Sequence, residues 1–503
     1  MKRLSVFCKA HWFEIAIVAI FILGVILRFA RYQQRWGLAY DQAHDAIIAR
    51  YALTHFKLPL LGPFSSAGPF QTSGMWYWFI MLGTLLFPFF VDGPWVFLTI
   101  LQSIFVIAMI YFGKELINKK FGLLLGLFTA ISTSQITQAT NLTNQAPLAF
   151  TSLGALWMSV RYLREKKKRY LFFMALFVGL GAAIHLQGGA MIALVVLTLL
   201  VTKTFDLRSL SLCFFGLILS WLPVFFIDVT HHFFNTKGML QYYLHDQYRV
   251  SLDSLGRNWK VYTFKFWPTS WAQIIGGEKI LGYILFFGFF VTLFIDTIKR
   301  RMSKEWVVII ASFLIMFAVL RYLRTPLFDS YLMFLNPFVL LFSAWVVYWL
   351  IKTQKIAGIL ILISILISSM LLDIQNISQS TNDTAIRANF WSMMIKAAYP
   401  MQKKFSMYDY GYATTWLSLP LTLYMQNQDK ITENGYKIGF GIPGREDPAN
   451  EHSFPIIPGN KMGFVLVDVE ASSSGQLSSH HWVKINPENV YHSTEAWYND
   501  KNL

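Results

Sequence analysis

Three ionisable residues near the start of the chain have types and a spacing suited to chemistry. Asp41, His44 and Asp45 lie in the polar stretch 38–50, just after the first long apolar run. If this stretch is helical, their spacing of three and four residues places them on one face. A carboxylate on such a face can act as a general base, bind a cation, or cap a helix that begins at Gln42.

The composition is typical of a helical membrane protein. Of the 503 residues, 55% are hydrophobic and 17% are aromatic. Apolar runs long enough to span a bilayer recur along the chain, separated by short polar joints. The net charge of +16 would suggest nucleic acid in a soluble protein. Here much of the basic excess lies in short loops, where it orients the chain and faces anionic lipid headgroups, so we expect no nucleic-acid partner.

Several kinds of site have no signature in the sequence. Cys8 and Cys213 are too few for a disulfide framework, and no Cys/His spacing typical of zinc occurs. Phosphate-binding loops, dinucleotide fingerprints and kinase motifs are also absent. The energy for a reaction must therefore come from an activated substrate or from a gradient.

The distribution of basic residues predicts the topology. Lys2, Arg3 and Lys9 place the N-terminus in the cytoplasm, and the later basic clusters fit the same side. The stretch 74–91 would invert every later loop if it crossed, so we expect it to be interfacial or re-entrant. The fold class is then an all-α polytopic membrane protein with about eleven spans, at 13–30, 94–113, 121–138, 145–163, 170–184, 188–203, 209–227, 279–298, 305–323, 331–351 and 356–373.

This topology collects the polar sequence on the outer face. It places there the first outer loop, 31–93, the large loop 228–278, and everything after residue 373. We expect a transmembrane module over 1–373 and a small extracytoplasmic α/β domain over 374–503. In that domain 413–425 reads as a helix and 463–469 as a buried strand.

The order of motifs on the outer face resembles that of the GT-C glycosyltransferases over residues 10–370. This superfamily uses polyprenyl-phosphate sugars and includes the protein O-mannosyltransferases and the lipid A aminoarabinose transferases. The motifs that carry the resemblance are Tyr40-Asp41-Gln42, Leu58-Pro59, Gly62-Pro63, Asn144-Gln145-Ala146-Pro147-Leu148, His185-Leu186-Gln187, Asp329-Ser330-Tyr331 and Asn336-Pro337. Gln42 and Asn144 stand where the family usually has acidic residues.

The resemblance implies an inverting transferase of a hexose or pentose, with Asp41 as the general base. It makes His44, Asp45 and Asn144 supporting residues for the acceptor or for a metal. A divalent cation, Mg or Mn, would use Asp41 and Asp45, but Asn144 in the second loop makes such a site an open question.

The leaving phosphate needs cations or hydrogen-bond donors on the same side as Asp41. Among the outer arginines, Arg28 is expected to snorkel at the end of the first span, as Lys and Arg often do there. Arg50 is a further outer cation. The candidate phosphate and lipid contacts are Arg31, Lys57, His185, Gln187, Arg321, Arg324 and Tyr331.

The sequence thus predicts a glycosyltransferase of the cell membrane, with a polyprenyl-phosphate sugar as donor and an extracytoplasmic protein, lipid or glycan as acceptor. One alternative is a transporter or flippase of lipid-linked sugars, which would carry ionisable residues in mid-span and inverted repeats. Ionisable residues instead gather near the span ends here. The other alternative is a non-catalytic assembly protein of the cell envelope that works through 374–503.

Overall fold

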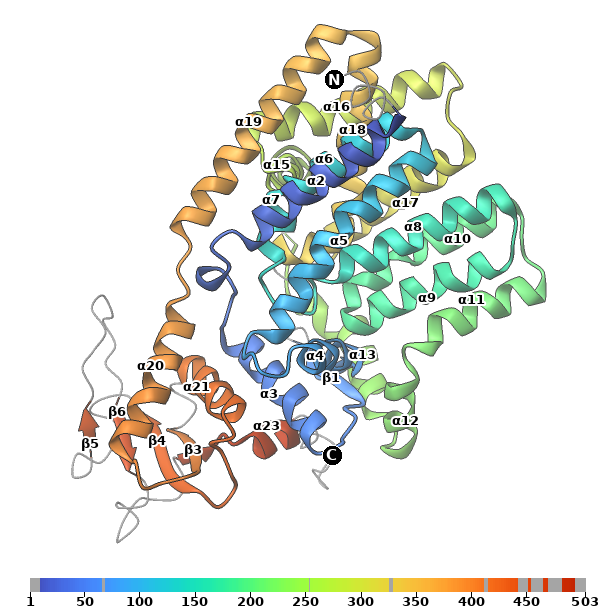
Figure 1. Ribbon diagram of the computed structural model, residues 1–503. Coiled ribbons are helices and arrows are strands. Elements are labelled where there is room, and N and C mark those ends of the chain that lie inside the picture. Colours follow the sequence, from blue (N-terminus) through green and yellow to red (C-terminus); the bar gives the residue numbers. More distant parts are fainter. Residues whose placement is uncertain are drawn as a thin grey trace. The chain divides into compact units, whose positions relative to one another are not determined.

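The computed structural model of the chain describes residues 10–65, 68–252, 254–324, 329–410, 415–441, 451–453, 465–468 and 482–493 (Figure 1). It consists of two compact units. The first unit contains 1–32, 64–76 and 98–380, and the second contains 33–63, 77–97 and 381–503. The first outer loop is therefore divided, and most of it belongs to the same unit as the C-terminal residues.

The first unit is built from helices. The bounds of its elements are α2 Trp12–Phe29, most of α5 Gly93–Leu116, α6 Lys119–Ala130, α7 Thr133–Gln138, α8 Leu148–Glu165, α9 Arg169–Ile184, η2 Leu186–Met191, α10 Ile192–Thr202, α11 Leu207–Leu219, α12 Leu222–Thr230, α13 Phe234–Leu244, η3 Asp246–Arg249, α14 Trp259–Val261, η4 Tyr262–Phe266, α15 Trp267–Ile275, α16 Lys279–Ile298, α17 Lys304–Arg321, η5 Asp329–Leu335, α18 Asn336–Thr353 and α19 Lys355–Gln379. The short helix η1 Tyr32–Gln34 begins in the first unit and ends in the second. The strand β2 Gln71–Ser73 also belongs here. Helix α9 packs against α8 on one side and α11 on the other, as Figure 1 shows.

Every predicted apolar run contains helix, but several runs are broken. Run 121–138 divides into α6 and α7, because Ser132 begins a new helix by accepting a hydrogen bond from the Gln135 amide. Run 209–227 divides into α11 and α12, which meet at 73°. Among the described residues, five helical stretches are long and apolar enough to cross a membrane, or six if that bent pair counts as one span. The count of about eleven spans stays a prediction.

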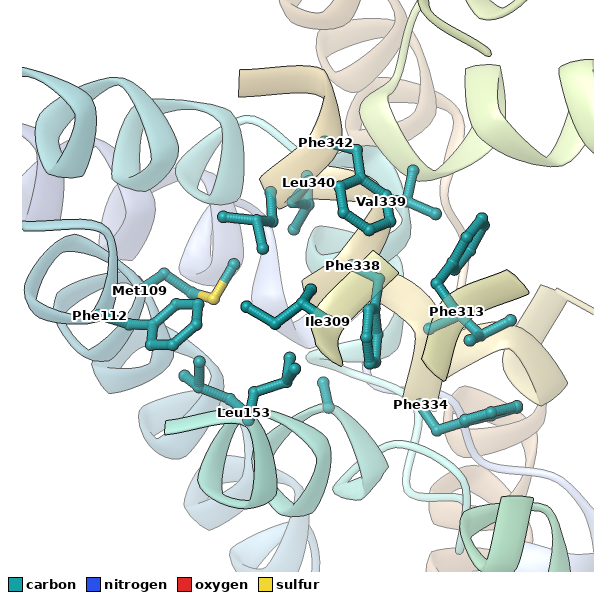
Figure 2. Packing of buried hydrophobic residues seen from close by; sticks show 14 of the residues in the cluster. Met109, Phe112, Leu153, Ile309, Phe313, Phe334, Phe338, Val339, Leu340 and Phe342 are labelled. Atoms are coloured by element: carbon teal, nitrogen blue, oxygen red, sulfur yellow. The ribbon is translucent and has the colours of Figure 1, made fainter. Parts of the chain in front are cut away.

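Aromatic and aliphatic side chains fill the centre of the first unit (Figure 2). Phe313 of α17 packs edge-on against Phe342 of α18, with 5.1 Å between ring centroids. Met109, Phe112 and Leu153 extend this cluster toward α5 and α8. Such close packing fixes the helix ends, which carry the polar residues described below.

Arg28 does not snorkel, so that expectation was wrong. Its side chain is fully buried, and its guanidinium donates to the carbonyls of Gly24, Thr129 and Ala130 at 3.1 Å each. Thr129 and Ala130 end α6, where backbone carbonyls lack helical partners and a cation is favourable. Arg28 therefore fastens α2 to the end of α6.

The second unit combines helices with a mixed sheet. Its elements are α3 Tyr40–Thr54, most of α4 Met75–Leu86, α20 Asp383–Ala398, β3 Phe405–Tyr410, α21 Thr415–Asn427, β4 Tyr436–Gly441, β5 Glu451–Ser453, β6 Val465–Asp468, β7 Trp482–Lys484 and α23 Pro487–Ser493; the short strand β1 Leu61–Phe64 begins in it. The strand order is β5-β6-β4-β3-β7, with β3 and β4 parallel and the other pairs antiparallel. Helix α21 connects the parallel pair, as a βαβ crossover requires.

The predicted helix at 413–425 is confirmed as α21, and the strand predicted at 463–469 as β6. Helix α4 has 12 residues and so spans about 18 Å, well short of a hydrocarbon core of about 30 Å. This length fits the interfacial placement of 74–91, which stays a prediction, as does a domain boundary near residue 373.

A buried asparagine holds the sheet of the second unit together, and its replacement should loosen that unit. The fully buried Asn486 accepts from the Met407 amide at 2.7 Å and donates to Ser406 Oγ at 2.9 Å and to the Thr432 carbonyl at 3.2 Å. We expect Asn486→Ala to destabilise the unit by about 2–4 kcal/mol, because it strands buried polar groups. Limited proteolysis should show earlier cleavage within 381–503, and an unchanged pattern would contradict this. Asn427→Ala, at the end of α21, is a control for loss of an amide elsewhere in the unit.

Candidate active site

Helix α3 presents the acidic motif at its first turn. It begins at Tyr40, and its N-cap, Ala39, makes no side-chain hydrogen bond. Asp41 is therefore the acidic residue of the first turn and not the cap, so the capping alternative is wrong. A carboxylate in this turn is favoured by the helix dipole, yet its oxygens are not consumed by capping.

The rest of α3 is buried, which fixes the direction of the motif. Ala43, Ala46 and Ala49 are at most 2% exposed, and their small side chains let α3 pack closely against α21 and α23. The Gln426 side chain also donates to the Ile47 carbonyl at 3.4 Å. The motif thus stands on a helix held by the C-terminal elements of its own unit.

The structure brings Asp41, His44 and Asp45 together at the start of α3. Asp41 is exposed, whereas Asp45 is buried and lies 3.1 Å from His44 Nδ1. The His44 ring also stacks on Tyr40, with centroids 6.1 Å apart. Surrounding protein displaces water and Asp45 adds a second negative charge, so the pKa of Asp41 is raised, while His44 lowers it. A raised pKa suits a carboxylate that must accept a proton.

The two neighbours of Asp41 should shift the pH dependence of any reaction in which it is the base. Asp45→Asn removes a negative charge, so the pKa of Asp41 should fall and the acidic limb of kcat/KM should move to lower pH. His44→Gln should move the same limb to higher pH, because His44 opposes the rise. The measurement is a pH–rate profile of both variants. Shifts of the same sign would contradict this assignment.

Lys57 is placed by aromatic rings. Its ammonium lies 5.2 Å from the centroid of Tyr51 and 5.0 Å from that of Tyr491. Tyr51 belongs to α3 and Tyr491 to α23, so this cation–π contact joins the first outer loop to the C-terminal elements. Sequence reasoning missed Tyr51 and Tyr491, since nothing local links residues so far apart.

In the first unit, four other predicted residues come together where η2 follows α9. Asn144 donates through Nδ2 to the Ile184 carbonyl at 3.4 Å. His185 follows directly, and its ring centroid lies 5.5 Å from that of Tyr331 in η5. The backbone N–H of Gln187 donates to His185 Nδ1 at 3.4 Å. The side-chain oxygen of Gln187, Oε1, is buried without a hydrogen-bond partner among the described residues.

His185 is suited to donate a hydrogen bond without carrying a charge. Burial lowers its pKa to about 4, so the imidazole is neutral at pH 7. Because Nδ1 accepts from the Gln187 amide, the proton resides on Nε2. The Nε2–H group can then donate to an anionic oxygen.

Polar side chains of α5 hold the loop that carries Asn144. Thr99 donates to the Ala139 carbonyl at 2.8 Å, and Gln102 donates to the Ala146 carbonyl at 2.9 Å. Both side chains are fully buried. The second outer loop is therefore fixed at both ends.

Arg321 and Arg324 are ordered by aromatic rings of the large outer loop. The Arg321 guanidinium lies 4.6 Å from the centroid of Trp259, and that of Arg324 lies 4.9 Å from Tyr248. Arg324 also donates to the Val250 carbonyl. Arg321 Nε is buried and has no hydrogen-bond partner among the described residues. Stacking orients a guanidinium and leaves its N–H groups available for an anion.

Sequence reasoning missed Arg257, which supports this arginine pair. It is buried and donates to the carbonyls of Leu320 at 3.0 Å and Leu323 at 2.6 Å. It thereby fixes the end of α17 on either side of Arg321. Its position in a polar loop gave no signal of burial.

Arg31 and Arg50 bind backbone carbonyls. Arg31 donates to the carbonyls of Ile377 and Ser378 near the end of α19. Arg50 donates to those of Pro88 at 3.2 Å and Phe90 at 3.1 Å. The phosphate role of Arg31 stays a prediction.

The acidic motif does not form a metal site from protein ligands alone. Among the described residues, no group of three or more His, Cys, Asp or Glu side chains is arranged to hold a metal ion. Asp45 Oδ1 faces His44 and the side chain is buried, which leaves Asp41 as the accessible carboxylate. A Mg or Mn ion held by both aspartates stays a prediction.

Comparisons with known proteins decide the fold. Residues 72–227 match the family model described as dolichyl-phosphate-mannose-protein mannosyltransferase. The crystal structure of ArnT from Cupriavidus metallidurans in the apo state superposes with a TM-score of 0.63 at 12% identity, covering 93% of this chain and 100% of that one. The chain has the GT-C fold.

Two further solved structures can be compared with the chain. The same ArnT bound to undecaprenyl phosphate gives a TM-score of 0.62 at 12% identity, covering 93% of this chain and 100% of that one. An oligosaccharyltransferase from Archaeoglobus fulgidus gives 0.49 at 11% identity, covering 83% and 64%. No protein with a curated function matches the sequence. The predicted resemblance to GT-C membrane glycosyltransferases is confirmed, and the family match and the fold support a lipid-linked-sugar glycosyltransferase.

Proposed function

We propose that this GT-C chain is an inverting glycosyltransferase that moves one sugar from a polyprenyl-phosphate donor to an extracytoplasmic acceptor. The observation that carries the proposal is the Asp41 carboxylate, exposed on the first turn of a buried helix, with its pKa raised by the surrounding protein and by Asp45. Such a carboxylate is preorganised to accept a proton from a hydroxyl group.

We assign binding of the sugar donor's phosphate to neutral and cationic hydrogen-bonding side chains of the first unit. His185 offers its Nε2–H, Tyr331 lies beside it, and Arg321 and Arg324 offer stacked guanidiniums. The ArnT structure bound to undecaprenyl phosphate supports a donor of this class. Hydrogen bonds from charged donors to phosphate oxygens would strengthen as the leaving group gains charge.

The reaction follows from these roles. Asp41 takes the proton of the acceptor hydroxyl while its oxygen attacks the anomeric carbon. The bond from that carbon to the phosphate oxygen breaks on the opposite face, and the electron pair leaves with the polyprenyl phosphate. One displacement inverts the anomeric centre. Asn144 and Gln187 position the loop and the imidazole that contact the donor.

The sugar is a hexose or a pentose, and the acceptor lies outside the cell membrane. In this proposal the N-terminus is cytoplasmic and residues 374–503 are extracytoplasmic, which agrees with the distribution of basic residues among the loops.

The test is donor turnover by the purified full-length chain in liposomes. Polyprenyl-phosphate sugars carrying a radiolabelled sugar are supplied with a membrane extract as acceptor. The expected result is release of free polyprenyl phosphate together with transfer of label to the acceptor. Movement of intact labelled lipid between leaflets without such release would overturn the proposal in favour of a transporter. The absence of both release and movement with every hexose and pentose donor would also contradict the proposal.

A further inference from the structure

Helices α5 and α6 form a tight hairpin that forces two lysines together. A Cβ atom at Gly122 would lie 2.4 Å from the Ile110 carbonyl oxygen, and one at Gly126 would lie 2.0 Å from Ile110 Cγ1. Only glycine permits this approach, as in other close helix pairs. The hairpin thus places Lys114, in the last turn of α5, near Lys119, which begins α6.

Both ammonium groups lie against one aromatic ring. Lys114 Nζ is 5.3 Å and Lys119 Nζ 5.2 Å from the centroid of Phe13, so the two charges are within about twice that distance of each other. Phe13 is 2% exposed. Two like charges on one ring repel each other, and an anion bound beside them would offset this repulsion.

A third cation lies near the same helix start. Asn118, the N-cap of α6, donates to the Tyr348 hydroxyl at 2.6 Å, and Lys352 Nζ is 4.4 Å from the centroid of that ring. Lys120 adds a fourth charge in the first turn of α6. We call Lys114, Lys119, Lys120 and Lys352 the lysine cluster.

The lysine cluster lacks the acidic partners that a neighbouring basic segment has. In the part of the chain that the structure describes, none of its four lysines forms an ion pair, and Glu115 pairs instead with Arg161 at 3.0 Å. In the segment 164–169, by contrast, Lys167 pairs with Glu165 at 2.7 Å and Lys168 with Asp206 at 2.5 Å. Unlike the segment 164–169, the lysine cluster therefore keeps a positive charge that no carboxylate among the described residues neutralises.

We propose that the lysine cluster binds the phosphate-bearing headgroup of an anionic glycerophospholipid. The cluster sits at the ends of α2, α5, α6 and α18, and α2, α5 and α18 lie in stretches long and apolar enough to cross a membrane. Next to it, Trp12 is 42% exposed, Ile15 44% and Tyr111 41%. These side chains offer apolar contact to an acyl chain, which distinguishes a lipid from free phosphate.

The test measures lipid binding to the purified full-length chain by native mass spectrometry. Phosphatidylglycerol is compared with phosphatidylcholine of the same acyl chains and with inorganic phosphate. We expect phosphatidylglycerol alone to bind, and Lys114→Gln with Lys119→Gln to weaken it at least about tenfold. The matched control, Lys167→Gln with Lys168→Gln, removes the same charge from paired lysines and should leave binding unchanged.

Three outcomes would overturn the proposal. If both double variants lose binding equally, the effect is one of net charge. If phosphatidylcholine binds as tightly as phosphatidylglycerol, the headgroup is not recognised. Binding of inorganic phosphate with the same affinity would assign the site to a free anion. Lys114→Arg with Lys119→Arg keeps the charge and should bind normally, which separates lost recognition from misfolding.

Discussion

Asp41→Asn should lower the rate of sugar transfer by about 10²–10⁴-fold, the contribution of a positioned general base. Asparagine keeps the size and the helical position of the side chain, but it cannot accept the acceptor proton. Donor affinity should change little, because the donor contacts are assigned to His185, Tyr331, Arg321 and Arg324. The measurement is kcat and the donor KM of the purified variant.

A matched control separates chemistry from helix stability. Asp383 is the exposed acidic residue in the first turn of α20, so Asp383→Asn makes the same change in the first turn of another helix of the second unit. Loss of the favourable dipole contact costs only about 0.3–1 kcal/mol at either site. Asp383→Asn should keep full activity. Retention of transfer by a folded Asp41→Asn variant would refute the role of Asp41.

Local patterns were enough to predict the helices but not their breaks. Run 279–298, for example, became the single helix α16. In 121–138, Ser132 both caps α7 and donates to the Ile274 carbonyl, and that second contact is 142 residues away in sequence. Polar residues inside an apolar run therefore need a tertiary partner before their effect is known.

The candidate site was predictable in its residue types and only partly in its contacts. Asp41, His44 and Asp45 meet because helical spacing alone brings them together. The contacts of Lys57 with Tyr491 and of Arg257 with Leu320 depend on tertiary packing that no local pattern encodes. Arg28 shows the same limit, because its burial depends on the carbonyls that end α6.

Arg321→Gln should raise the donor KM by about 10- to 100-fold, since hydrogen bonds to a charged partner contribute roughly 1.5–3 kcal/mol. The Trp259 ring holds the guanidinium in place, and the buried Nε lacks a hydrogen-bond partner among the described residues, so the group is ordered before a ligand arrives. A control is Arg249→Gln, which removes a charge from the large outer loop 228–278, the loop that also contains Trp259. Arg249 is paired with Asp246 at 3.0 Å and highly exposed, so this variant should bind donor normally.

The conservative variant tells a phosphate contact from a packing role. Lysine keeps the charge of Arg321 but loses the planar fork and most of the stacking on Trp259. If Arg321 binds the donor phosphate with two N–H groups, Arg321→Lys should recover only a small part of the lost affinity, while kcat at saturating donor stays near that of the parent chain. If the residue only packs against Trp259, Arg321→Met should restore donor KM as well as Arg321→Lys does. That second pattern would remove Arg321 from the donor site.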